Sequence, residues 1–124
     1  MNSRQPAASG RPIPNALTIA GVDPSGGAGI LADGQAMSAL GAYGCAIIAA
    51  LTAQNTQGVT GISPVPPAFV GLQIDTLFTD VRIDAVKVGM LGQRPIIEVV
   101  GEKLAKWTPA HVVLAPDMVA KSGD

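Results

Sequence analysis

A glycine-rich turn is the first part of the sequence whose residue types could bind a ligand. Residues 23–29 read DPSGGAG and follow a short apolar stretch. Glycine permits positive φ angles and a close approach of the backbone to a ligand, and peptide N–H groups at the start of a following helix can bind polar ligand atoms. The spacing matches neither the P-loop, which ends in Gly-Lys-Ser/Thr, nor the dinucleotide fingerprint. The turn therefore indicates either a ligand-facing loop or an ordinary strand-to-helix connection.

Two polar side chains further along suit the edge of a nitrogen heterocycle. Asp33 lies one turn into a predicted helix, where its carboxylate either interacts with the helix dipole or accepts hydrogen bonds from an amine. Gln54 follows an apolar stretch, and its amide can donate to a ring nitrogen while accepting from an exocyclic amine. It fits an ordinary loop amide equally well. The two residues on their own leave both alternatives open.

Two more candidates carry sulfur and positive charge. Met90 follows a predicted strand, and its polarizable thioether suits either an aromatic ring or an irregular gap in the core. Lys121, Ser122 and Asp124 offer a cation, a hydroxyl and a carboxylate that suit phosphates or a metal. Charged residues near a terminus are commonly just solvated, so that alternative stays open as well.

The single cysteine and the single histidine are assigned no catalytic role. Cys45 lies within an apolar stretch and has no basic neighbour in the sequence, which predicts a buried, inert thiol. His111 has no second histidine or cysteine to complete a metal-ligand spacing. One cysteine also excludes an internal disulfide.

The segments between these candidates alternate between strand and helix patterns. Four short apolar stretches predict strands at residues 16–20, 45–51, 85–88 and 111–115. Longer segments with helical periodicity predict helices at residues 28–40, in the stretch that follows Pro66 and Pro67, and from residue 95 onward. A polar loop is predicted at residues 54–58, and another begins at residue 116. This alternation predicts an α/β protein with a mainly parallel sheet, whose ligand binds at the carboxyl ends of the strands.

The apolar pattern also indicates which side chains face the core and which loops meet. The predicted inward-facing residues are Ile30, Met37 and Leu40 in the first helix, Phe69, Leu72, Ile74, Leu77 and Phe78 in the second, and Ile96, Val99, Val100 and Leu104 in the third. Glu102, Lys103 and Lys106 are expected to face water. The stretch at residues 45–51 is expected to be covered on both faces. Loops beginning at Gly21, Thr52, Gly89 and Pro116 each follow a strand, so we expect them to form the rim of one pocket.

Composition and charge narrow the class of ligand. Hydrophobic residues make up 48% of the 124 residues and charged residues 14%, which excludes a solvated disordered chain and favours one layered unit. Eight basic and nine acidic residues give a net charge of −1, so the chain lacks the electrostatic footprint of a nucleic-acid or anionic-lipid binder. No apolar run reaches the roughly 18 residues of a membrane span. We therefore expect a cytoplasmic protein with a small-molecule ligand, and neither nucleic acid nor membrane as a partner.

Residues 1–14 are expected to form a loose tail. They contain Arg4 and Arg11 together with serine, glycine and proline, but lack the continuous apolar stretch of a secretory signal. The basic, acid-free composition also resembles a short organelle transit peptide, although no amphipathic repeat accompanies it. Residues 15–124 are expected to form the folded part of the chain.

Four segments, in this order, carry a resemblance to a known enzyme family. They read ALTIAGVDPSGGAGILAD, ALGAYGCAIIAALTAQNTQGV, DVRIDAVKVGMLG and MVAKSGD, and lie within residues 15–124. In order and spacing they resemble the hydroxymethylpyrimidine/phosphomethylpyrimidine kinases of thiamine biosynthesis, which are ribokinase-like enzymes. The resemblance implies a three-layer fold, in which a mainly parallel sheet carries helices on both faces, truncated here to about its first half.

The resemblance also implies a reaction and a set of binding residues. Such kinases phosphorylate 4-amino-5-hydroxymethyl-2-methylpyrimidine and then its monophosphate, using ATP and a divalent metal, Mg. By the resemblance, Gly21, Asp33, Gln54 and Met90 line the aminopyrimidine pocket, and Lys121 lies near the nucleotide or its phosphates. Members of the family are often dimers, so the implied macromolecular partner is a second copy or a missing C-terminal half.

Departures from the family pattern lower the activity expected of this chain. Relatives are about twice this length, and their catalytic cysteine and Gly-Thr-Gly-Cys anion hole lie beyond its end, so no catalytic residue is assigned. Where relatives commonly read Asp-Pro-Val-Met, this chain reads Ala115-Pro116-Asp117-Met118. Ala115 therefore lacks a carboxylate near the metal, and Asp117 places a charge beside the pyrimidine.

An interior glycine, Gly34, costs the first helix about 1 kcal/mol relative to alanine. We expect a kinase without appreciable activity as an isolated chain, and a non-catalytic pyrimidine-binding remnant as the alternative.

Overall fold

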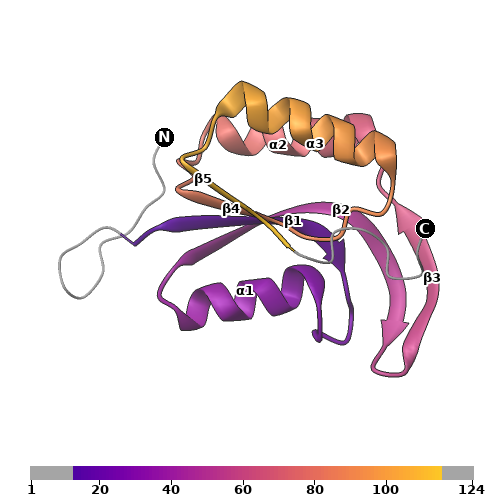
Figure 1. The fold of residues 1–124 in the computed structure, drawn as a ribbon. Helices are drawn as coiled ribbons and strands as arrows, with labels where there is room; N and C mark the ends of the chain where they lie inside the picture. Colours follow the sequence, from indigo (N-terminus) through magenta and orange to yellow (C-terminus); the bar gives the residue numbers. More distant parts are fainter. Residues whose placement is uncertain (1–12, 116–124) are drawn as a thin grey trace.

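Five strands form one sheet between two helical layers in the computed structural model, which describes residues 13–115 (Figure 1). Helices α2 and α3 cover one face of the sheet and α1 covers the other. The strands are β1 (Asn15–Val22), β2 (Tyr43–Asn55), β3 (Gly58–Pro64), β4 (Ala85–Val88) and β5 (His111–Leu114), and the helices are α1 (Gly29–Ala39), α2 (Pro67–Phe78) and α3 (Arg94–Trp107). The predicted three-layer α/β architecture is confirmed.

The strand order is β3-β2-β1-β4-β5, with β1 in the centre. β1 pairs in parallel with β2 and β4, and β4 pairs in parallel with β5, while β3 runs antiparallel to β2. Helix α1 joins the parallel pair β1/β2, and α3 joins the parallel pair β4/β5, because a parallel connection must return the chain to the same end of the sheet. The carboxyl ends of the four parallel strands therefore lie together.

The main core lies between the sheet and the α2/α3 layer. Alternate side chains of the central strands point toward these helices and are almost completely buried, which follows from the two-residue period of a strand. The strand residues of this core are Leu17, Ile19, Ile47, Ala49, Val86 and Val88, and the helices contribute Val70, Ile74, Ile96 and Val100. The opposite face is covered less completely, since α1 has no fully buried residue.

Strand β3 is the main error in the predicted elements. Residues 54–58 were expected to form a polar loop, but Gln54 and Asn55 end β2 and Gly58 begins β3. Every residue of β3 is exposed, and two glycines and a proline interrupt its sequence, so it lacks the alternation by which a strand is predicted. Figure 1 shows the β2–β3 hairpin bending away from the α2/α3 layer toward the level of α1.

Strand β2 and helix α2 are also less covered than the sequence indicated. Ile47 and Ala49 are buried, but Leu51 is exposed, so β2 is not covered on both faces as expected. In α2, Phe69 and Leu72 are exposed although both were expected to face inward. They line an open groove of about 390 Å³ between α2 and β2. The predicted inward face of α3 is confirmed, whereas Leu40 is exposed beyond the end of α1.

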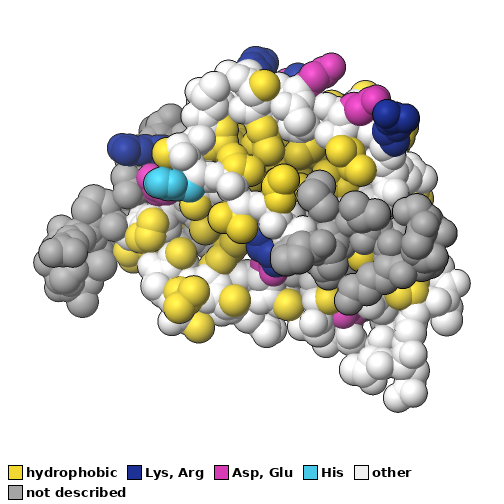
Figure 2. Space-filling model, in the orientation of Figure 1, with side chains coloured by type: hydrophobic (Ala, Val, Ile, Leu, Met, Phe, Trp, Pro, Cys, Tyr) yellow, Lys and Arg dark blue, Asp and Glu magenta, His cyan; other side chains and the backbone are white. Residues whose placement is uncertain are grey.

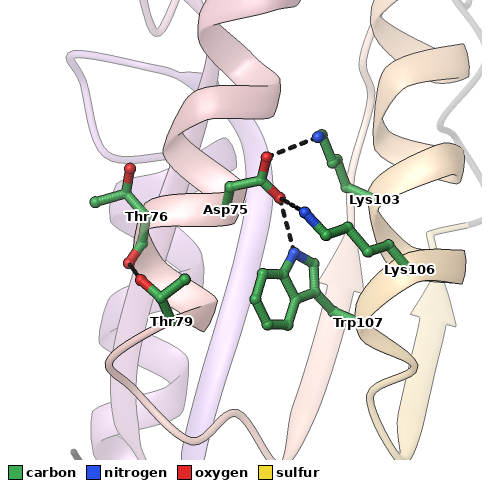
Figure 3. Close-up of polar contacts among 6 residues, drawn as sticks. All are labelled: Asp75, Thr76, Thr79, Lys103, Lys106 and Trp107. Atoms are coloured by element: carbon green, nitrogen blue, oxygen red, sulfur yellow. Dashed lines mark hydrogen bonds and ion pairs between the residues drawn. The ribbon is translucent and has the colours of Figure 1, made fainter.

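A polar network joins α2 to α3 (Figure 3). The Asp75 carboxylate accepts hydrogen bonds from Lys103 Nζ at 2.6 Å, Trp107 Nε1 at 2.8 Å and Lys106 Nζ at 3.2 Å. The Trp107 ring also stacks on Phe78, with the ring centroids 5.6 Å apart. Lys106 is exposed, as expected, whereas the Lys103 side chain is only 23% exposed, and both ammonium groups bind a carboxylate of the neighbouring helix.

Strand β5 lies at the edge of the sheet and exposes apolar side chains on both faces. Val112 and Leu114 lie in register with Val86 and Val88, which face the α2/α3 layer, whereas Val113 lies in register with Lys87 on the α1 side. All three β5 side chains are exposed. Figure 2 shows hydrophobic side chains on both sides of this strand. Within residues 13–115, no helix is long and apolar enough to cross a membrane.

Candidate functional site

A cavity of about 500 Å³ opens at the carboxyl ends of the parallel strands. Its walls come from the end of β1, the glycine-rich turn, the first turns of α1, the far half of the β2–β3 hairpin and the loop after β4. Ala115, directly after β5, closes another side. Such crevices are where parallel α/β sheets bind ligands, because several loops converge there.

The glycine-rich turn is fixed by its own aspartate. Asp23 is 6% exposed, and its carboxylate accepts hydrogen bonds from the Ser25 hydroxyl at 2.7 Å, the Ser25 N–H at 2.9 Å and the Gly27 N–H at 3.2 Å. The Ser25 hydroxyl and N–H contribute most to holding the pKa of Asp23 below its usual value. This carboxylate is therefore committed to shaping the turn at the mouth of the cavity.

Gly29 sets where α1 begins. Its φ is +64°, a conformation that L side chains rarely adopt, and a Cβ atom there would lie 2.2 Å from the Gly21 carbonyl oxygen. Gly29 also forms an isolated antiparallel bridge with Val22. The close approach folds the start of α1 back onto the end of β1 and brings the first turns of α1 to the cavity.

Asp33 lies inside the cavity wall and is held by two neighbouring strands. Its Oδ2 accepts a hydrogen bond from the Thr18 hydroxyl of β1, and its Oδ1 accepts one from the Lys87 ammonium group of β4, both at 2.6 Å. Thr18 is 1% exposed, so its hydroxyl depends on this carboxylate for a partner. The alternative in which Asp33 serves only the helix dipole is therefore insufficient, because the side chain binds two strands.

Gln54 reaches the cavity from the far end of β2. The register of the β2–β3 pair shifts between Ala53 and Gln54, and such an irregularity re-aims the side chains of the strand. The Thr52 hydroxyl lies 2.7 Å from the Val22 carbonyl oxygen and 3.2 Å from Gln54 Oε1. A hydroxyl has one proton, so its donation to the nearer oxygen leaves the Gln54 amide available to a ligand.

The remaining wall is largely apolar. Met90, at the start of the loop after β4, is 40% exposed, and Val59 and Ile62 of β3 are exposed above the same cavity. Leu91 closes the wall behind them and is buried. Apolar walls with a few polar groups are typical of sites that bind small organic molecules.

The four residues predicted to line a pocket, Gly21, Asp33, Gln54 and Met90, do line this one cavity. Lys121 and Asp117 lie outside the described residues, whereas Ala115 lines the cavity and is 9% exposed. Some residues of the site were not predicted from the sequence. Lys87, Val59 and Ile62 line the cavity, and Thr18 binds Asp33. A lysine inside the otherwise apolar strand AVKV was the available signal for Lys87.

Cys45 and His111 lie away from the cavity wall. Cys45 packs half-buried against the core, and this burial raises the pKa of its thiol. His111 begins β5 at the opposite end of that strand from Ala115. That neither side chain is a nucleophile or a metal ligand stays a prediction.

Few metal-ligating side chains gather in the described part of the chain. Among residues 13–115, no three acidic, histidine or cysteine side chains cluster as metal ligands would. The carboxylates that line the cavity are those of Asp23 and Asp33, which accept hydrogen bonds from Ser25 and from Thr18 and Lys87 respectively.

Comparison with known proteins identifies the family of this fold and cavity. The phosphomethylpyrimidine kinase family matches residues 23–124. The hydroxymethylpyrimidine/phosphomethylpyrimidine kinase of Escherichia coli (strain K12) is 57% identical over 110 residues, which cover 89% of this chain and 41% of that protein. The chain thus spans about two-fifths of the length of this curated relative.

Solved structures agree with the sequence match. The phosphomethylpyrimidine kinase of Clostridium difficile 630 superposes with a TM-score of 0.83 at 44% identity, covering 90% of this chain and 48% of that one. The pyridoxal kinase of Bacillus subtilis, solved as an ADP complex, gives a TM-score of 0.78 at 32% identity, covering 88% and 42%. The mainly parallel α/β sheet, its superposition on these kinases and a family match over residues 23–124 point the same way, and the chain belongs to the phosphomethylpyrimidine kinase family.

Proposed function

We propose that the cavity binds 4-amino-5-hydroxymethyl-2-methylpyrimidine and its monophosphate, and that residues 15–124 form the pyrimidine-binding half of a thiamine-biosynthetic kinase. Gly21, Asp33, Gln54 and Met90 are its ligand-binding residues. In this proposal the protein acts in the cytoplasm on a small molecule, without nucleic acid or membrane.

The observation that carries the proposal is the pairing of an acceptor and an amide in one largely apolar cavity. An aminopyrimidine presents an exocyclic N–H donor beside ring-nitrogen acceptors. Asp33 can accept from the amine, and the Gln54 amide can donate to a ring nitrogen. Met90 offers a polarizable thioether to the flat face of the ring, and Val59 and Ile62 offer aliphatic contact.

Phosphoryl transfer by the isolated chain is not part of the proposal. Such a transfer requires an in-line hydroxyl, neutralised phosphate charge and electrostatic stabilisation of the moving group. ATP and Mg are the expected co-substrate and metal, and Lys121 is the residue proposed to lie near the phosphates. We expect the other groups that phosphoryl transfer requires to come from a C-terminal half or a second chain. A second copy of this chain, in a homodimer, is the alternative partner.

A non-catalytic pyrimidine-binding module is the second candidate, and Ala115 favours it. Its methyl group forms part of the cavity wall at the end of β5, where the family resemblance implies a carboxylate near the metal. A buried methyl cannot bind a cation or the phosphates. This candidate retains the pyrimidine site and gives up transfer even when a partner supplies the missing half.

Calorimetric titration followed by a turnover assay tests both candidates. The purified chain is titrated with 4-amino-5-hydroxymethyl-2-methylpyrimidine and, as a matched control, with pyridoxal. The same sample is then incubated with ATP and Mg. Binding of the pyrimidine in preference to pyridoxal, without turnover, is the expected result. The absence of pyrimidine binding would overturn the proposed site, and turnover by the pure chain would overturn the assignment of transfer to other groups.

The second candidate is separated from the first by one substitution. Ala115→Asp is assayed in the presence of the C-terminal half of a relative, supplied as a separate chain. ATP-dependent phosphorylation by Ala115→Asp but not by the wild type would identify the chain as a binding module that lost its metal-facing carboxylate. Turnover by both would favour the kinase half.

A further inference from the structure

A lysine stands in the wall of the cavity on an otherwise apolar strand. Lys87 belongs to β4, whose Val86 and Val88 are buried in the main core, so the alternation of the strand directs the lysine to the opposite, α1 side. Its ammonium group lies 2.6 Å from Asp33 Oδ1, and the two side chains are 41% and 12% exposed. Ion pairs between fully exposed groups contribute little, but here the carboxylate is mostly shielded from water.

A second contact fixes the same carboxylate from the other side. The Thr18 hydroxyl of β1 donates to Asp33 Oδ2 at 2.6 Å, and Thr18 is 1% exposed. Both carboxylate oxygens are thereby held by neighbouring strands, although Asp33 itself belongs to α1. The side chain has little freedom to rotate away from the cavity.

The two contacts leave Asp33 able to accept further hydrogen bonds. A carboxylate has about four acceptor positions, two on each oxygen, and Thr18 and Lys87 each occupy one. Asp33 lines the cavity, so a ligand can reach the remaining positions. A carboxylate that is oriented before the ligand arrives binds an N–H donor more tightly than a mobile one, because the ordering cost is already met.

We infer that Lys87 is a positioning residue, which holds the Asp33 carboxylate aimed into the cavity for the amino group of the pyrimidine. This inference rests on the proposed function. Lys87 acts through Asp33, and its effect is therefore specific to ligands with an N–H donor at that place. A purely structural lysine would affect all ligands of the cavity alike.

The test compares two ligands with three variants of the full chain. Binding of 4-amino-5-hydroxymethyl-2-methylpyrimidine and of the analogue without the 4-amino group is measured by calorimetry for the wild type, Lys87→Met, Lys87→Arg and Lys106→Met. Methionine keeps the aliphatic stem but removes the charge. Lys106→Met removes the same charge from α3, where Lys106 binds Asp75 away from the cavity. Thermal unfolding of each variant checks that it is folded.

We expect Lys87→Met to weaken binding of the amino compound by roughly 10-fold to 100-fold, the effect of losing a charge-assisted hydrogen bond, and binding of the analogue by less than about 3-fold. Lys87→Arg should recover part of the affinity, and Lys106→Met should match the wild type. Equal losses for both ligands, or an unchanged affinity of Lys87→Met for the amino compound, would overturn the inference and leave the proposed function standing. A Lys87→Met chain that does not fold would show a structural role and count against it. Failure of the wild type to bind either compound would instead overturn the proposed function, and this inference with it.

Discussion

Glycines at different positions of this chain have different structural roles. Gly29 has a positive φ and lies against the Gly21 carbonyl, so a side chain is excluded there. Gly34 lies within α1, and a Cβ atom at that position would meet no atom within 4 Å. The first glycine is required by the cavity, whereas the second only lowers the stability of a helix.

Gly34→Ala is therefore expected to stabilise the chain by about 0.5–1 kcal/mol, because alanine loses less backbone entropy in a helix and meets open space here. Gly29→Ala should destabilise it by more than about 2 kcal/mol, since it adds both a left-handed alanine and a backbone clash. Chemical denaturation with a circular dichroism signal measures both changes. A loss of stability in Gly34→Ala would show that α1 contacts something at this position.

Gln54 is the residue of the proposed site whose removal should be least harmful to the fold. Gln54→Ala is expected to weaken binding of the aminopyrimidine by roughly 10-fold, the loss of one or two neutral hydrogen bonds. Gln57, in the turn of the same hairpin, is the matched control, because Gln57 is exposed and does not line the cavity. Calorimetry should give Gln57→Ala the wild-type affinity, and equal effects of both substitutions would assign the loss to the hairpin.

At the scale of elements, the sequence was sufficient for the helices and the parallel strands, because their apolar residues form short runs or recur at helical spacing. Pro67 and Pro95 marked the first turns of α2 and α3, and the short apolar stretches marked β1, β2, β4 and β5. Strand β3 has no such stretch, because two glycines and a proline interrupt its sequence. Its pairing with β2 holds it in place, and pairing is not visible in one strand's sequence.

The candidate site was predictable in residues near the strand ends and the start of α1, and not in residues in the middle of the strands. Gly21, Asp33, Gln54 and Met90 were found because they follow strands or open a helix, and the resemblance to a family selected the same four. Thr18 and Lys87 were missed because their partner, Asp33, is 15 and 54 residues away in sequence. The same limit applies to Lys103, whose partner Asp75 belongs to another helix.

The Asp75 network predicts how the junction of α2 and α3 responds to acid. Hydrogen bonding by Lys103, followed by Trp107, lowers the pKa of Asp75 from 3.8 to about 2. A lowered folded-state pKa stabilises the fold above the unfolded value, so the contribution of Asp75 is complete above about pH 4 and is lost as the pH falls toward 2. Asp75→Asn should therefore be less stable than the wild type at neutral pH, and the difference should shrink over that window.

Denaturation midpoints measured from pH 7 to pH 2 check this prediction. Glu98→Gln is the matched control, because Glu98 is an exposed carboxylate on α3 whose partner, Arg94, is 88% exposed. Its midpoint should follow that of the wild type at every pH. A constant difference between Asp75→Asn and the wild type down to pH 2 would show that the carboxylate's charge does not hold the two helices together.

At the scale of the whole molecule, the β5 edge exposes apolar side chains that an isolated chain leaves in contact with water. Among residues 13–115, no strand pairs with the outer edge of β5, and a strand with such an edge and exposed valine and leucine on both faces is a template for pairing with another chain. The groove beside Phe69 and Leu72 adds a second exposed apolar region on α2. We therefore expect the isolated chain to self-associate or to express poorly.

Leu114→Lys tests whether the β5 edge causes this association. A lysine on an edge strand resists pairing, because a second strand would have to bury its charge. We expect the substitution to raise the concentration at which association begins by roughly 10-fold or more. Leu40→Lys is the control, since Leu40 is 86% exposed, lies at the end of α1 and does not belong to β5. Light scattering after size-exclusion chromatography measures both, and equal effects would assign the association to general hydrophobicity.

The central position of β1 also determines the order in which the walls of the cavity can assemble during folding. The hairpin, α1 and β1 can assemble as soon as residues 15–64 have been synthesised, and they bring Asp33 and Gln54 together. Lys87 can reach Asp33 only after α2 has crossed over and β4 has docked, which closes a loop of 54 residues. Long-range closures of this kind are slow steps of folding. During folding, the Asp33 carboxylate therefore lacks its Lys87 partner until β4 docks, and the proposed binding site is completed last.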